Sequence, residues 1–388
     1  MNNTLPLQST LDTDLYKLSM AQVIYHYFPK TKVRYKFYNR KNIQFPEGFA
    51  HKLQERIEMM SDLRASKSEI LWLGNISFMR PTWVEWFAGY RYNTTEVTIS
   101  QTGGRVEIQI EGYWYRTIHW EVALMALICE TYYEMTNTNL DPDWESRIQV
   151  KAEKLSKAGC FWLDFGTRRR RGFFTQDKVV ATMKKYPGFL GTSNPYLAWK
   201  YGVTAQGTYA HEAIMGVSAI VGARMANKIW MKYWADFYEG NLGVALTDTF
   251  TTEGFLQDFT SYEARLFDGV RHDSSDPIVW GERMLAHYAK LKIPAENKRL
   301  VFSDNLNPDT YIPIHQRFQG RAQPCAGIGT NFSNDCGVSP LNIVIKLDAV
   351  NYEDRGFVPV VKLSDDEGKH TGNSELIERI KGELNLRA

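Results

Sequence analysis

The stretch G-V-T-A-Q-G-T-Y-A-H-E-A-I-M, residues 202–215, combines a short β-type run, a glycine turn and the beginning of a helix. The run Val203–Ala205 ends at Gly207, and a helix-prone segment opens at His211. A strand that passes through a short turn into a helix is the repeating unit of parallel α/β folds. This stretch therefore predicts a strand of a parallel sheet at residues 203–205.

The same unit recurs along the chain from Cys160 onward. Short apolar runs end in polar or glycine-rich clusters: 160–163, 188–190, 203–205, 242–246, 266–270, 300–302 and 326–329. The helix candidates between these runs include Thr175–Tyr186, Glu212–Tyr238, Pro277–Leu291 and Pro308–Phe318. Repeated strand–loop–helix units imply parallel strands with right-handed crossovers. So many units favour a parallel (β/α) barrel, although periodicity is also compatible with an open sheet.

The N-terminal part has a different pattern. It predicts helices at Thr10–Phe28 (N-cap Asp12 or Thr13), Glu47–Leu63 and Ser66–Leu73, and strands at Val33–Arg40, Glu96–Ser100 and Arg105–Glu111. Gly103-Gly104 predicts the turn of a hairpin. Strand-like sequence patterns return at Leu341–Leu347 and Phe357–Leu363, before a last predicted helix at Ser374–Leu386. We predict an α+β domain of residues 1–135 plus 338–388, whose sheet the C-terminal strands complete, and a (β/α) barrel catalytic domain of residues 136–337.

Composition narrows the class of protein. The chain has 388 residues, of which 44% are hydrophobic and 13% aromatic, enough for a large core. The net charge of +2 gives no general attraction to nucleic acid or to an anionic membrane. The four cysteines, Cys129, Cys160, Cys325 and Cys336, form no C-x-x-C pair, which predicts reduced, packed thiols.

Two further features bear on localisation. The first ten residues, M-N-N-T-L-P-L-Q-S-T, have neither a basic nor an apolar region of the kind found in a signal peptide. The apolar segment Ile118–Met135 is interrupted by charged residues and predicts a core helix, not a membrane span. We expect a soluble, cytoplasmic protein.

Polar residues follow nearly every apolar run from Cys160 onward. The clusters are D-F-G-T-R (164–168), G-T-S-N (191–194), G-T-Y-A-H (207–211), T-D-T (247–249), R-H-D-S-S-D (271–276), S-D-N (303–305) and G-T-N (329–331). One such loop proves nothing, because these residues are common turn formers. A whole series at one face of a barrel, where catalytic groups gather, indicates a phosphorylated sugar substrate and a divalent metal.

His211 stands out among these clusters, since the start of a helix points its N–H groups at anions. A histidine there can contact phosphate, act as a general base or accept a phosphoryl group. It can equally cap the helix. The run Arg168–Arg171 is best interpreted as a phosphate clamp, with a solvated surface run as the alternative for Arg170 and Arg171. D-F-G (164–166) lacks the other kinase elements, and the other histidines show no metal-ligand spacing.

Seven motifs carry a family resemblance: D-T-D-L-Y-K-L-S-M (12–20), D-F-G-T-R-R-R (164–170), G-T-S-N (191–194), G-T-Y-A-H-E (207–212), L-T-D-T-F (246–250), G-V-R-H-D-S-S-D (269–276) and G-I-G-T-N (327–331). Together they closely resemble nicotinate phosphoribosyltransferase. The resemblance implies an irregular α/β barrel with an N-terminal α+β domain and a homodimer with shared sites. It also implies synthesis of nicotinate mononucleotide from nicotinate and phosphoribosyl pyrophosphate (PRPP) in NAD salvage, coupled to ATP through a phosphohistidine.

The resemblance implies a site for the pyridine base. Tyr16, donated by the other subunit, and Phe165 match aromatic groups that sandwich the ring, while Thr208 and Arg271 match the nicotinate-binding threonine and arginine. Ser193 also lies at the base-binding end. A relative that uses nicotinamide carries an acidic residue there, so the neutral Ser193 disfavours nicotinamide.

The resemblance also assigns the phosphate and ribose site. His211 matches the phosphorylated histidine. The other matched positions are Arg168, the catalytic Asp248 and Asp273, and the PRPP-contacting turn Gly329-Thr330. Mg²⁺ is expected with ATP and PRPP, with no side chain assigned as its ligand and no organic prosthetic group. D-S-S-D departs from the frequent D-S-G-D, and Ser275 lacks the freedom of glycine at positive φ.

Three alternatives accompany this interpretation. The first is a nicotinamide phosphoribosyltransferase, and the second a barrel phosphoribosyltransferase without ATP coupling, such as the decarboxylating quinolinate enzyme, which G-T-Y-A-H-E disfavours. The third is a catalytically silent sugar-phosphate or RNA-binding regulator, suggested by the arginine run. The prediction is an ATP-dependent, ligase-type nicotinate phosphoribosyltransferase that binds neither nucleic acid nor membranes.

Overall fold

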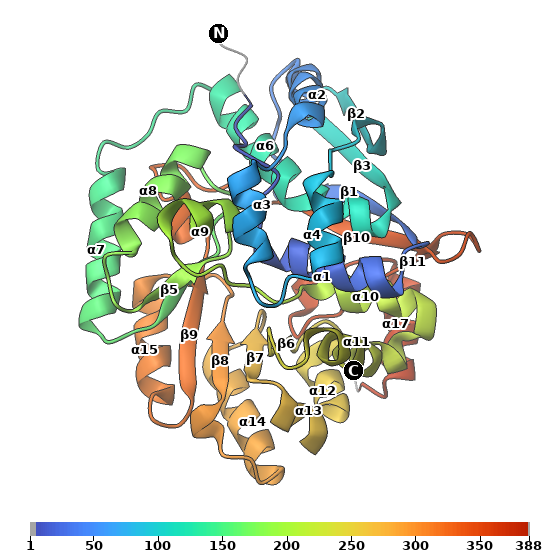
Figure 1. The fold of residues 1–388 in the computed structure, drawn as a ribbon, viewed down its shortest axis with the longest axis vertical. Coiled ribbons are helices and arrows are strands. Elements are labelled where there is room, and N and C mark those ends of the chain that lie inside the picture. Colours follow the sequence, from blue (N-terminus) through green and yellow to red (C-terminus); the bar gives the residue numbers. More distant parts are fainter. Residues whose placement is uncertain (1–4, 387–388) are drawn as a thin grey trace. The chain divides into compact units, whose positions relative to one another are not determined.

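A computed structural model describes residues 5–386 of the chain. The chain forms two compact units, whose elements Figure 1 labels. The first unit contains the chain up to Pro29, Arg34–Gly207 and Ile328–Lys346. The second contains Lys30–Val33, Thr208–Gly327 and the chain from Leu347. Each unit therefore gathers segments that are far apart in sequence. The predicted domain boundaries near residues 135 and 338 stay a prediction.

The first unit contains most of the N-terminal elements and the first parallel strands. These are α1 (Leu15–Tyr27), β1 (Lys32–Asn39, which begins in the second unit), α2 (Phe49–Met59), η1 (Met60–Asp62), α3 (Lys67–Gly74), α4 (Pro81–Ala88), η2 (Thr94–Glu96), β2 (Val97–Thr102), β3 (Arg105–Tyr113), α5 (Trp114–Thr117), α6 (Trp120–Met135), α7 (Trp144–Lys157), β4 (Trp162–Asp164), α8 (Phe173–Met183), β5 (Phe189–Thr192), α9 (Pro195–Tyr201) and α16 (Thr330–Ser333).

Local sequence explains several of these elements. Ser66 caps α3 and forms a capping box with Glu69, as helix-start chemistry favours. The predicted hairpin is confirmed, with Thr102 opposite Arg105 and Gly103 in the turn at φ 56°. In β3 the apolar residues alternate with polar ones, and the apolar side chains are buried. The helix predicted near Ile118–Met135 is α6, which is buried along most of its length.

The start of α1 differs from the prediction. The helix begins at Leu15 with Asp14 at its N-cap, not at Thr10 with Asp12 or Thr13 as the cap. The Asp12 carboxylate lies before the helix start, is fully buried and accepts hydrogen bonds from Arg170. It therefore makes a tertiary contact and is not the N-cap.

The second unit is built from parallel strands, helices and the C-terminal segment. Its elements are α10 (His211–Val221), α11 (Ala223–Tyr238), β6 (Val244–Leu246), α12 (Thr251–Asp258), α13 (Ser261–Leu266), β7 (Gly269–His272), α14 (Pro277–Lys290), η3 (Ala295–Asn297), β8 (Arg299–Phe302), α15 (Pro308–Phe318), β9 (Gln323–Ile328), β10 (Ile343–Asn351, which begins in the first unit), β11 (Val358–Pro359), η4 (Glu367–Lys369) and α17 (Ser374–Glu383).

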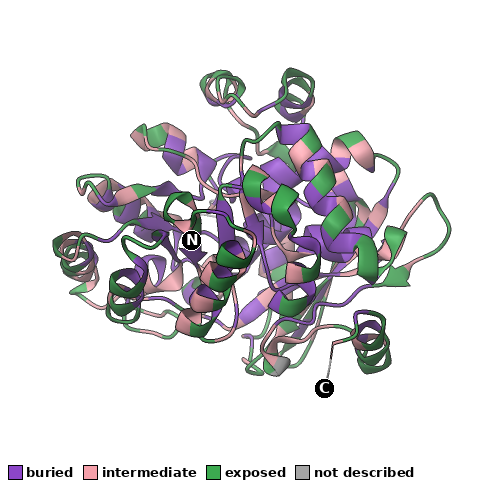
Figure 2. Ribbon diagram, turned by 90° about the horizontal axis from the view of Figure 1, so that it is seen from below, coloured by how far each residue is buried: buried purple, intermediate pink, exposed green. Residues whose placement is uncertain are grey.

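The parallel arrangement matches the prediction. In the second unit the strands lie in the order β9-β8-β7-β6, with parallel pairing throughout. In the first unit β4 and β5 also pair in parallel. The helices carry a buried stripe beside an exposed one, as the purple and green bands of Figure 2 show; in α14 the buried side is Trp280, Gly281, Met284 and Tyr288.

Two predictions in the stretch around His211 are wrong. Residues 203–205 form no strand, only an isolated parallel bridge between Ala205 and Thr192. Thr192 exchanges backbone hydrogen bonds with Thr204 and Gln206 at this bridge, and the backbone turns at Gly202 (φ 64°) and Gly207 (φ 149°) on either side. The long helix predicted at 212–238 is interrupted by Gly222 (φ 82°), which ends α10 and precedes α11.

The C-terminal part forms less strand than expected. The N–H of Arg40 donates to the carbonyl of Asn342 at 3.0 Å, so the beginning of β10 lies beside the end of β1 as predicted. The second predicted strand, 357–363, is reduced to Val358–Pro359, which pairs with β10. The residues after it leave the sheet, because their backbone bonds elsewhere: the N–H of Leu363 donates to the carbonyl of Thr249.

Two other sequence expectations can be compared with the structure. All four cysteines are free and buried, which confirms packed thiols. Across residues 5–386, no helix has both the length and the apolar character that crossing a bilayer requires.

Candidate active site

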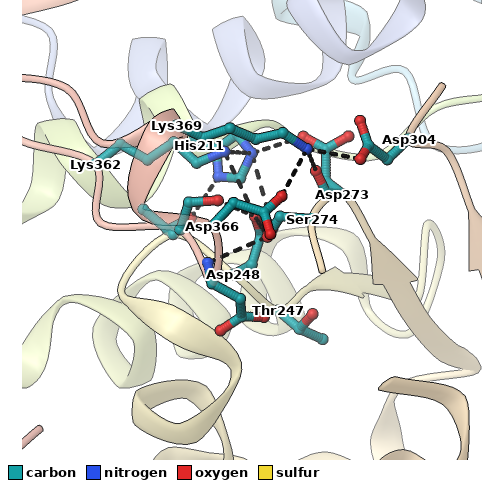
Figure 3. A network of polar contacts seen from close by, with 12 residues as sticks. His211, Thr247, Asp248, Asp273, Ser274, Asp304, Lys362, Asp366 and Lys369 are labelled. Carbon is teal, nitrogen blue, oxygen red and sulfur yellow. Dashed lines mark hydrogen bonds and ion pairs between the residues drawn. The ribbon is translucent and has the colours of Figure 1, made fainter. Parts of the chain in front are cut away.

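The first residue of α10, His211, lies where the loops after β6 and β7 meet in the second unit (Figure 3). Its Nε2 atom is 2.8 Å from Oδ2 of Asp273, which follows β7. Its Nδ1 atom is 3.0 Å from Oγ1 of Thr249, which follows β6. Both nitrogens of the ring are therefore held by neighbours, and the ring orientation is fixed.

Asp248, next to Thr249, is the second carboxylate of this site and is buried. Its Oδ2 atom accepts hydrogen bonds from Ser274 at 2.6 Å and from Ser364 at 3.2 Å. Its Oδ1 atom has no hydrogen-bond partner among the described residues and lies 3.8 Å from Nε2 of His211. An unsatisfied carboxylate oxygen therefore remains beside the histidine.

Lys362 is the member of the site that sequence reasoning missed. Its Nζ atom lies 2.9 Å from Nε2 of His211 and 3.4 Å from Oδ2 of Asp248, and its side chain is only 9% exposed. The residue lay in a segment predicted as an ordinary strand. The only available signal was a lysine within an otherwise apolar run, V-V-K-L at 360–363.

Burial and a neighbouring cation favour the neutral form of the His211 ring. Burial, followed by the positive charge of Lys362, lowers the pKa of His211, against the opposing effect of Asp248 and Asp273. Burial raises the pKa of Asp273, but the hydrogen bond to His211 and the charge of Arg271 bring it well below its usual range. Burial also raises the pKa of Asp248, but its neighbours His211 and Lys362 bring that pKa below its usual value. A neutral ring with a lone pair can act as a base or a nucleophile.

The segment from Lys362 to Lys369 is anchored to the loops that carry the two aspartates. Asp365 accepts hydrogen bonds from the N–H of Thr252 at 2.7 Å and its hydroxyl at 2.6 Å. Lys369 contacts Asp304 at 2.6 Å and donates to the carbonyl of Asp273 at 3.3 Å, as Figure 3 shows. The C-terminal segment is thus part of the site.

The loop after β7 contains the D-S-S-D motif, and Ser275 adopts a left-handed conformation with φ 73°. Its N–H donates to Asp366, and its carbonyl lies 3.1 Å from Nε2 of His272. The turn therefore has the geometry that usually calls for glycine, although serine occupies it.

Two predicted base-binding residues also lie in the second unit. Arg271 is near the end of β7 and donates weakly to Ser303 at 3.4 Å and to the carbonyl of Tyr209 at 3.2 Å. Its Nε atom is buried without a hydrogen-bond partner among the described residues. The hydroxyl of Thr208 donates to the carbonyl of Val244 at 2.9 Å. Arg271 thus retains donor capacity for a ligand.

The remaining predicted site residues lie in the first unit. Gly329 has no Cβ, and one placed there would lie 3.1 Å from the carbonyl oxygen of Phe165, so the close approach favours glycine. Thr330 is the first residue of α16. Tyr16 is the second residue of α1. Arg168 keeps its side chain 45% exposed and contacts Glu121 at 3.3 Å.

Ser193 has an acidic neighbour that the sequence did not reveal. Its hydroxyl donates to Oδ1 of Asp14 at 2.6 Å, and both residues are buried. Burial raises the pKa of Asp14, and the hydrogen bond from Ser193 opposes that change. A neutral residue at position 193 therefore does not keep negative charge away from this place.

Two arginines of the run Arg168–Arg171 lie in different environments. Arg168 is accessible to ligands, whereas Arg170 is fully buried, so neither alternative predicted for Arg170 holds. Its guanidinium nitrogens donate to Asp12 at 2.7 and 3.0 Å, to Glu130 at 3.0 Å and to Gln176 at 3.3 Å. With every nitrogen satisfied, Arg170 joins segments of the first unit and is not a phosphate clamp.

One group of side chains could hold a cation. The ligand atoms of His211, Asp248 and Asp273 all lie within 4.8 Å of one another. Hard divalent cations prefer carboxylate oxygens, and the unsatisfied Oδ1 of Asp248 is such an oxygen.

The two units thus contain parallel strands with a histidine–aspartate–lysine cluster at the carboxyl ends of two of them. Comparison with known proteins shows which family of α/β proteins has this arrangement. A family model described as the nicotinate phosphoribosyltransferase (NAPRTase) family matches residues 160–388, and one for the NAPRTase N-terminal domain matches residues 11–129.

Individual relatives agree with the family models. Proteins named nicotinate phosphoribosyltransferase from Chromohalobacter salexigens and Desulforapulum autotrophicum are each 43% identical, over 98% and 95% of this chain and 99% and 96% of their own. The solved nicotinate phosphoribosyltransferase of Porphyromonas gingivalis has a TM-score of 0.95 at 36% identity, covering 98% of this chain and all of its own. A putative one from Saccharomyces cerevisiae has a TM-score of 0.94 at 32% identity, covering 99% of both chains.

The chain belongs to the nicotinate phosphoribosyltransferase family. The predicted family and the predicted α/β fold class, an irregular parallel barrel with an α+β domain, are both confirmed.

Proposed function

We propose that the protein makes nicotinate mononucleotide from nicotinate and PRPP and that ATP drives this reaction through phosphorylation of His211. Family membership supports the transferase reaction. The observation that carries the ATP coupling is the position of His211 at the start of α10, with its ring oriented through both of its nitrogens. A ring that only capped the helix would not need Asp273, Asp248 and Lys362 around it.

The transferase step needs orientation more than covalent chemistry. The pyridine nitrogen attacks C1 of the ribose while pyrophosphate leaves, so positive charge develops on the sugar and negative charge on the leaving group. Arg271, whose Nε atom has no hydrogen-bond partner within residues 5–386, is suited to the carboxylate of nicotinate. The exposed Arg168 is suited to a phosphate.

The phosphorylation step uses the lone pair of a ring nitrogen of His211. That pair forms a bond to the γ-phosphorus of ATP, and the bond from this phosphorus to the bridging oxygen breaks with its electrons leaving on ADP. The N-terminus of α10 favours the negative charge that the histidine gains. The ring nitrogen that does not attack carries the proton and donates it in a hydrogen bond to the neighbouring oxygen, which is on Thr249 or Asp273.

Mg²⁺ is the one metal this chemistry calls for. The residues present fit it, because Asp248 and Asp273 offer carboxylate oxygens and one of them lacks a partner. When bound with the phosphates, the ion neutralises charge on the leaving pyrophosphate and on ATP. A homodimer that brings Tyr16 to its partner's base site is part of the same proposal.

Nicotinamide is a second candidate substrate, favoured by one observation. Asp14 lies 2.6 Å from Ser193, at the place where an acidic group would accept a hydrogen bond from an amide. A carboxylate there also repels the carboxylate of nicotinate.

One assay tests both ideas. ADP and mononucleotide formation is followed with nicotinate and, separately, with nicotinamide. We expect a large preference for nicotinate and one ADP formed with each mononucleotide. Faster use of nicotinamide would favour the second candidate, and mononucleotide synthesis that ATP does not stimulate would overturn the coupling.

A further inference from the structure

The charges around His211 present a difficulty for a phosphorylated ring. Two carboxylates, Asp248 and Asp273, lie 3.8 and 2.8 Å from Nε2. A phosphoryl group would add about two negative charges at the same place. Like charges this close destabilise each other strongly in a partly buried site. Besides the Mg²⁺ proposed above, a positive charge of the protein in contact with the phosphohistidine would stabilise it.

Lys362 is placed to supply that charge. Its Nζ atom is 2.9 Å from Nε2 of His211, and the side chain has little access to solvent. Lys369, in the same segment, reaches the backbone carbonyl of Asp273 and the carboxylates of Asp304 and Asp366, not the ring. Arg271 stays 3.8 Å from the carboxylate of Asp273.

Nε2 cannot satisfy both of its neighbours at once. If it carries the proton, it donates to Asp273 and has no lone pair for Lys362. If it lacks the proton, it accepts from Lys362 and can give nothing to Asp273. One of the two short contacts, at 2.8 and 2.9 Å, is therefore not a hydrogen bond in either neutral tautomer. The ammonium of Lys362 is thus free to change partners.

We propose that Lys362 is a catalytic residue of the phosphorylation step, whose ammonium moves from Nε2 and Asp248 onto the oxygens of the incoming phosphoryl group. The inference rests on the proposed phosphorylation of His211. The bond changes are those given above for the transfer from ATP. Lys362 neither gives nor takes a proton and acts as a fixed charge with hydrogen-bond donors. Later hydrolysis breaks the phosphorus–nitrogen bond, leaving the electron pair on the ring and releasing inorganic phosphate.

The anchoring of its segment suits Lys362 to this role. The neighbouring backbone is fixed by Leu363 to Thr249 and by Asp365 to Ser274 and Thr252. The backbone therefore stays in place while the long side chain changes contacts. Because the anchors Thr249 and Ser274 lie in the same loops as the two aspartates, the base of the Lys362 side chain stays close to them.

The test measures how far ATP phosphorylates His211 at equilibrium with ADP. Full-length protein is mixed with γ-labelled ATP at several ATP:ADP ratios, and acid-labile label is counted in rapid-quench samples before hydrolysis. Loss of a hydrogen bond to a charged group predicts a phosphorylation equilibrium about 10- to 100-fold less favourable in Lys362→Met. Lys362→Gln, which keeps a donor without the charge, should lose as much. Lys362→Arg should recover most of the label.

Two controls separate charge from folding. Lys381→Met removes a lysine on α17 that pairs with Glu378 at 3.0 Å and should leave the labelling equilibrium unchanged. Urea unfolding of each variant checks that the fold is retained, and Lys362→Gln replaces Lys362→Met if the latter does not fold. A purely structural role for Lys362 would lower stability while the label per folded molecule stayed constant.

The outcomes distinguish this inference from the function on which it rests. No acid-labile label in the unmodified protein overturns both. Label in the unmodified protein with an equal equilibrium in Lys362→Met or Lys362→Gln overturns the role of Lys362 alone. A labelling equilibrium restored in Lys362→Arg but about 10- to 100-fold less favourable in Lys362→Gln supports it.

Discussion

The molecule buries charge in two places, and the two differ in how completely the charges are paired. In the first unit, every guanidinium nitrogen of Arg170 has an acceptor on Asp12, Glu130 or Gln176. In the second unit, Nε2 of His211 lies near more groups than it can bond, and Oδ1 of Asp248 has no partner among the described residues.

This difference distinguishes a charge network that stabilises the fold from one that can carry out a reaction. A fully paired network has nothing left to offer a ligand and one favoured arrangement, so it holds segments together. A site with competing partners has alternatives close in energy and a free oxygen, so it can accept a new charged group. Both clusters are built from aspartate and a basic residue, and composition alone would not tell them apart.

The largest expected effect is on the chemistry of the second cluster. His211→Asn should abolish acid-labile labelling from γ-labelled ATP and ATP hydrolysis, because the nucleophile is gone. Slow mononucleotide synthesis should remain and no longer respond to ATP, since transfer needs only orientation and stabilisation of pyrophosphate. Unfolding in urea should barely change. Label that persists on the variant would mean that the nucleophile lies elsewhere.

The converse effect is expected in the first cluster. Arg170→Met leaves the buried Asp12 and the half-buried Glu130 without their cation, which should cost about 3–5 kcal/mol of unfolding free energy. Urea unfolding measures it. The control is Arg317→Met, because Arg317 is 55% exposed and its partner Glu282 also binds Arg321; a change below about 1 kcal/mol is expected there. Equal losses of unfolding free energy in the two variants would show that the buried Arg170 network supports the fold no more than an exposed ion pair does.

The next largest effect is expected at His119. It is buried in the first unit, and neither ring nitrogen has a hydrogen-bond partner among the described residues. Burial, followed by the charges of Lys17 and Arg116, lowers its pKa to about 3. Because the pKa is lower in the folded protein, the stability contribution of the neutral ring is fully present above the unfolded pKa near 6.5. This contribution is lost as the pH falls from there toward 3. Between pH 6.5 and 5 the loss should be about 2 kcal/mol.

Urea unfolding at these two pH values tests this expectation. His119→Leu should be less sensitive to acid by that amount, because the variant has nothing to protonate at this position. The exposed His51 offers the control His51→Gln, which should keep the original pH dependence. An unchanged pH dependence in His119→Leu would show that other groups cause the acid sensitivity.

The smallest effect is expected in the loop after β7. Ser275 has φ 73°, which costs a side chain about 1–2 kcal/mol, while glycine loses about 0.5–1 kcal/mol through its freer unfolded chain. Ser275→Gly should therefore stabilise the protein by under about 1 kcal/mol in urea unfolding. A clear loss of stability would show that the serine side chain supports the loop.

Sequence patterns predicted the parts of the fold that depend on local rules. The Ser66 helix start, the Gly103 hairpin and helix α15 at Pro308–Phe318 were predictable from capping, turn and periodicity signals. The absence of a strand at 203–205 was not predictable, because a short apolar run between two glycines looks the same in a strand and at a single bridge. The break at Gly222 was visible as a glycine in a long helical pattern, but tolerated glycines look the same.

The candidate site was predictable only where residues belong to motifs. His211, Asp248 and Asp273 follow strand-like runs, and the structure brings these three together. Lys362 and Asp14 could not be found in this way. Each reaches its partner from a remote segment, and a single sequence carries no signal for such a pairing.

That remoteness also governs how the chain must fold. Arg170 and Asp12 are 158 positions apart, and Lys362 and His211 are 151 apart. Closing loops of this length costs conformational entropy before any contact rewards it, and chains rich in distant contacts cross higher folding barriers. Neither cation can leave water until its counter-charges arrive from the other end of such a loop. Both clusters therefore assemble late in folding, after the hairpin and the helices have formed from local interactions.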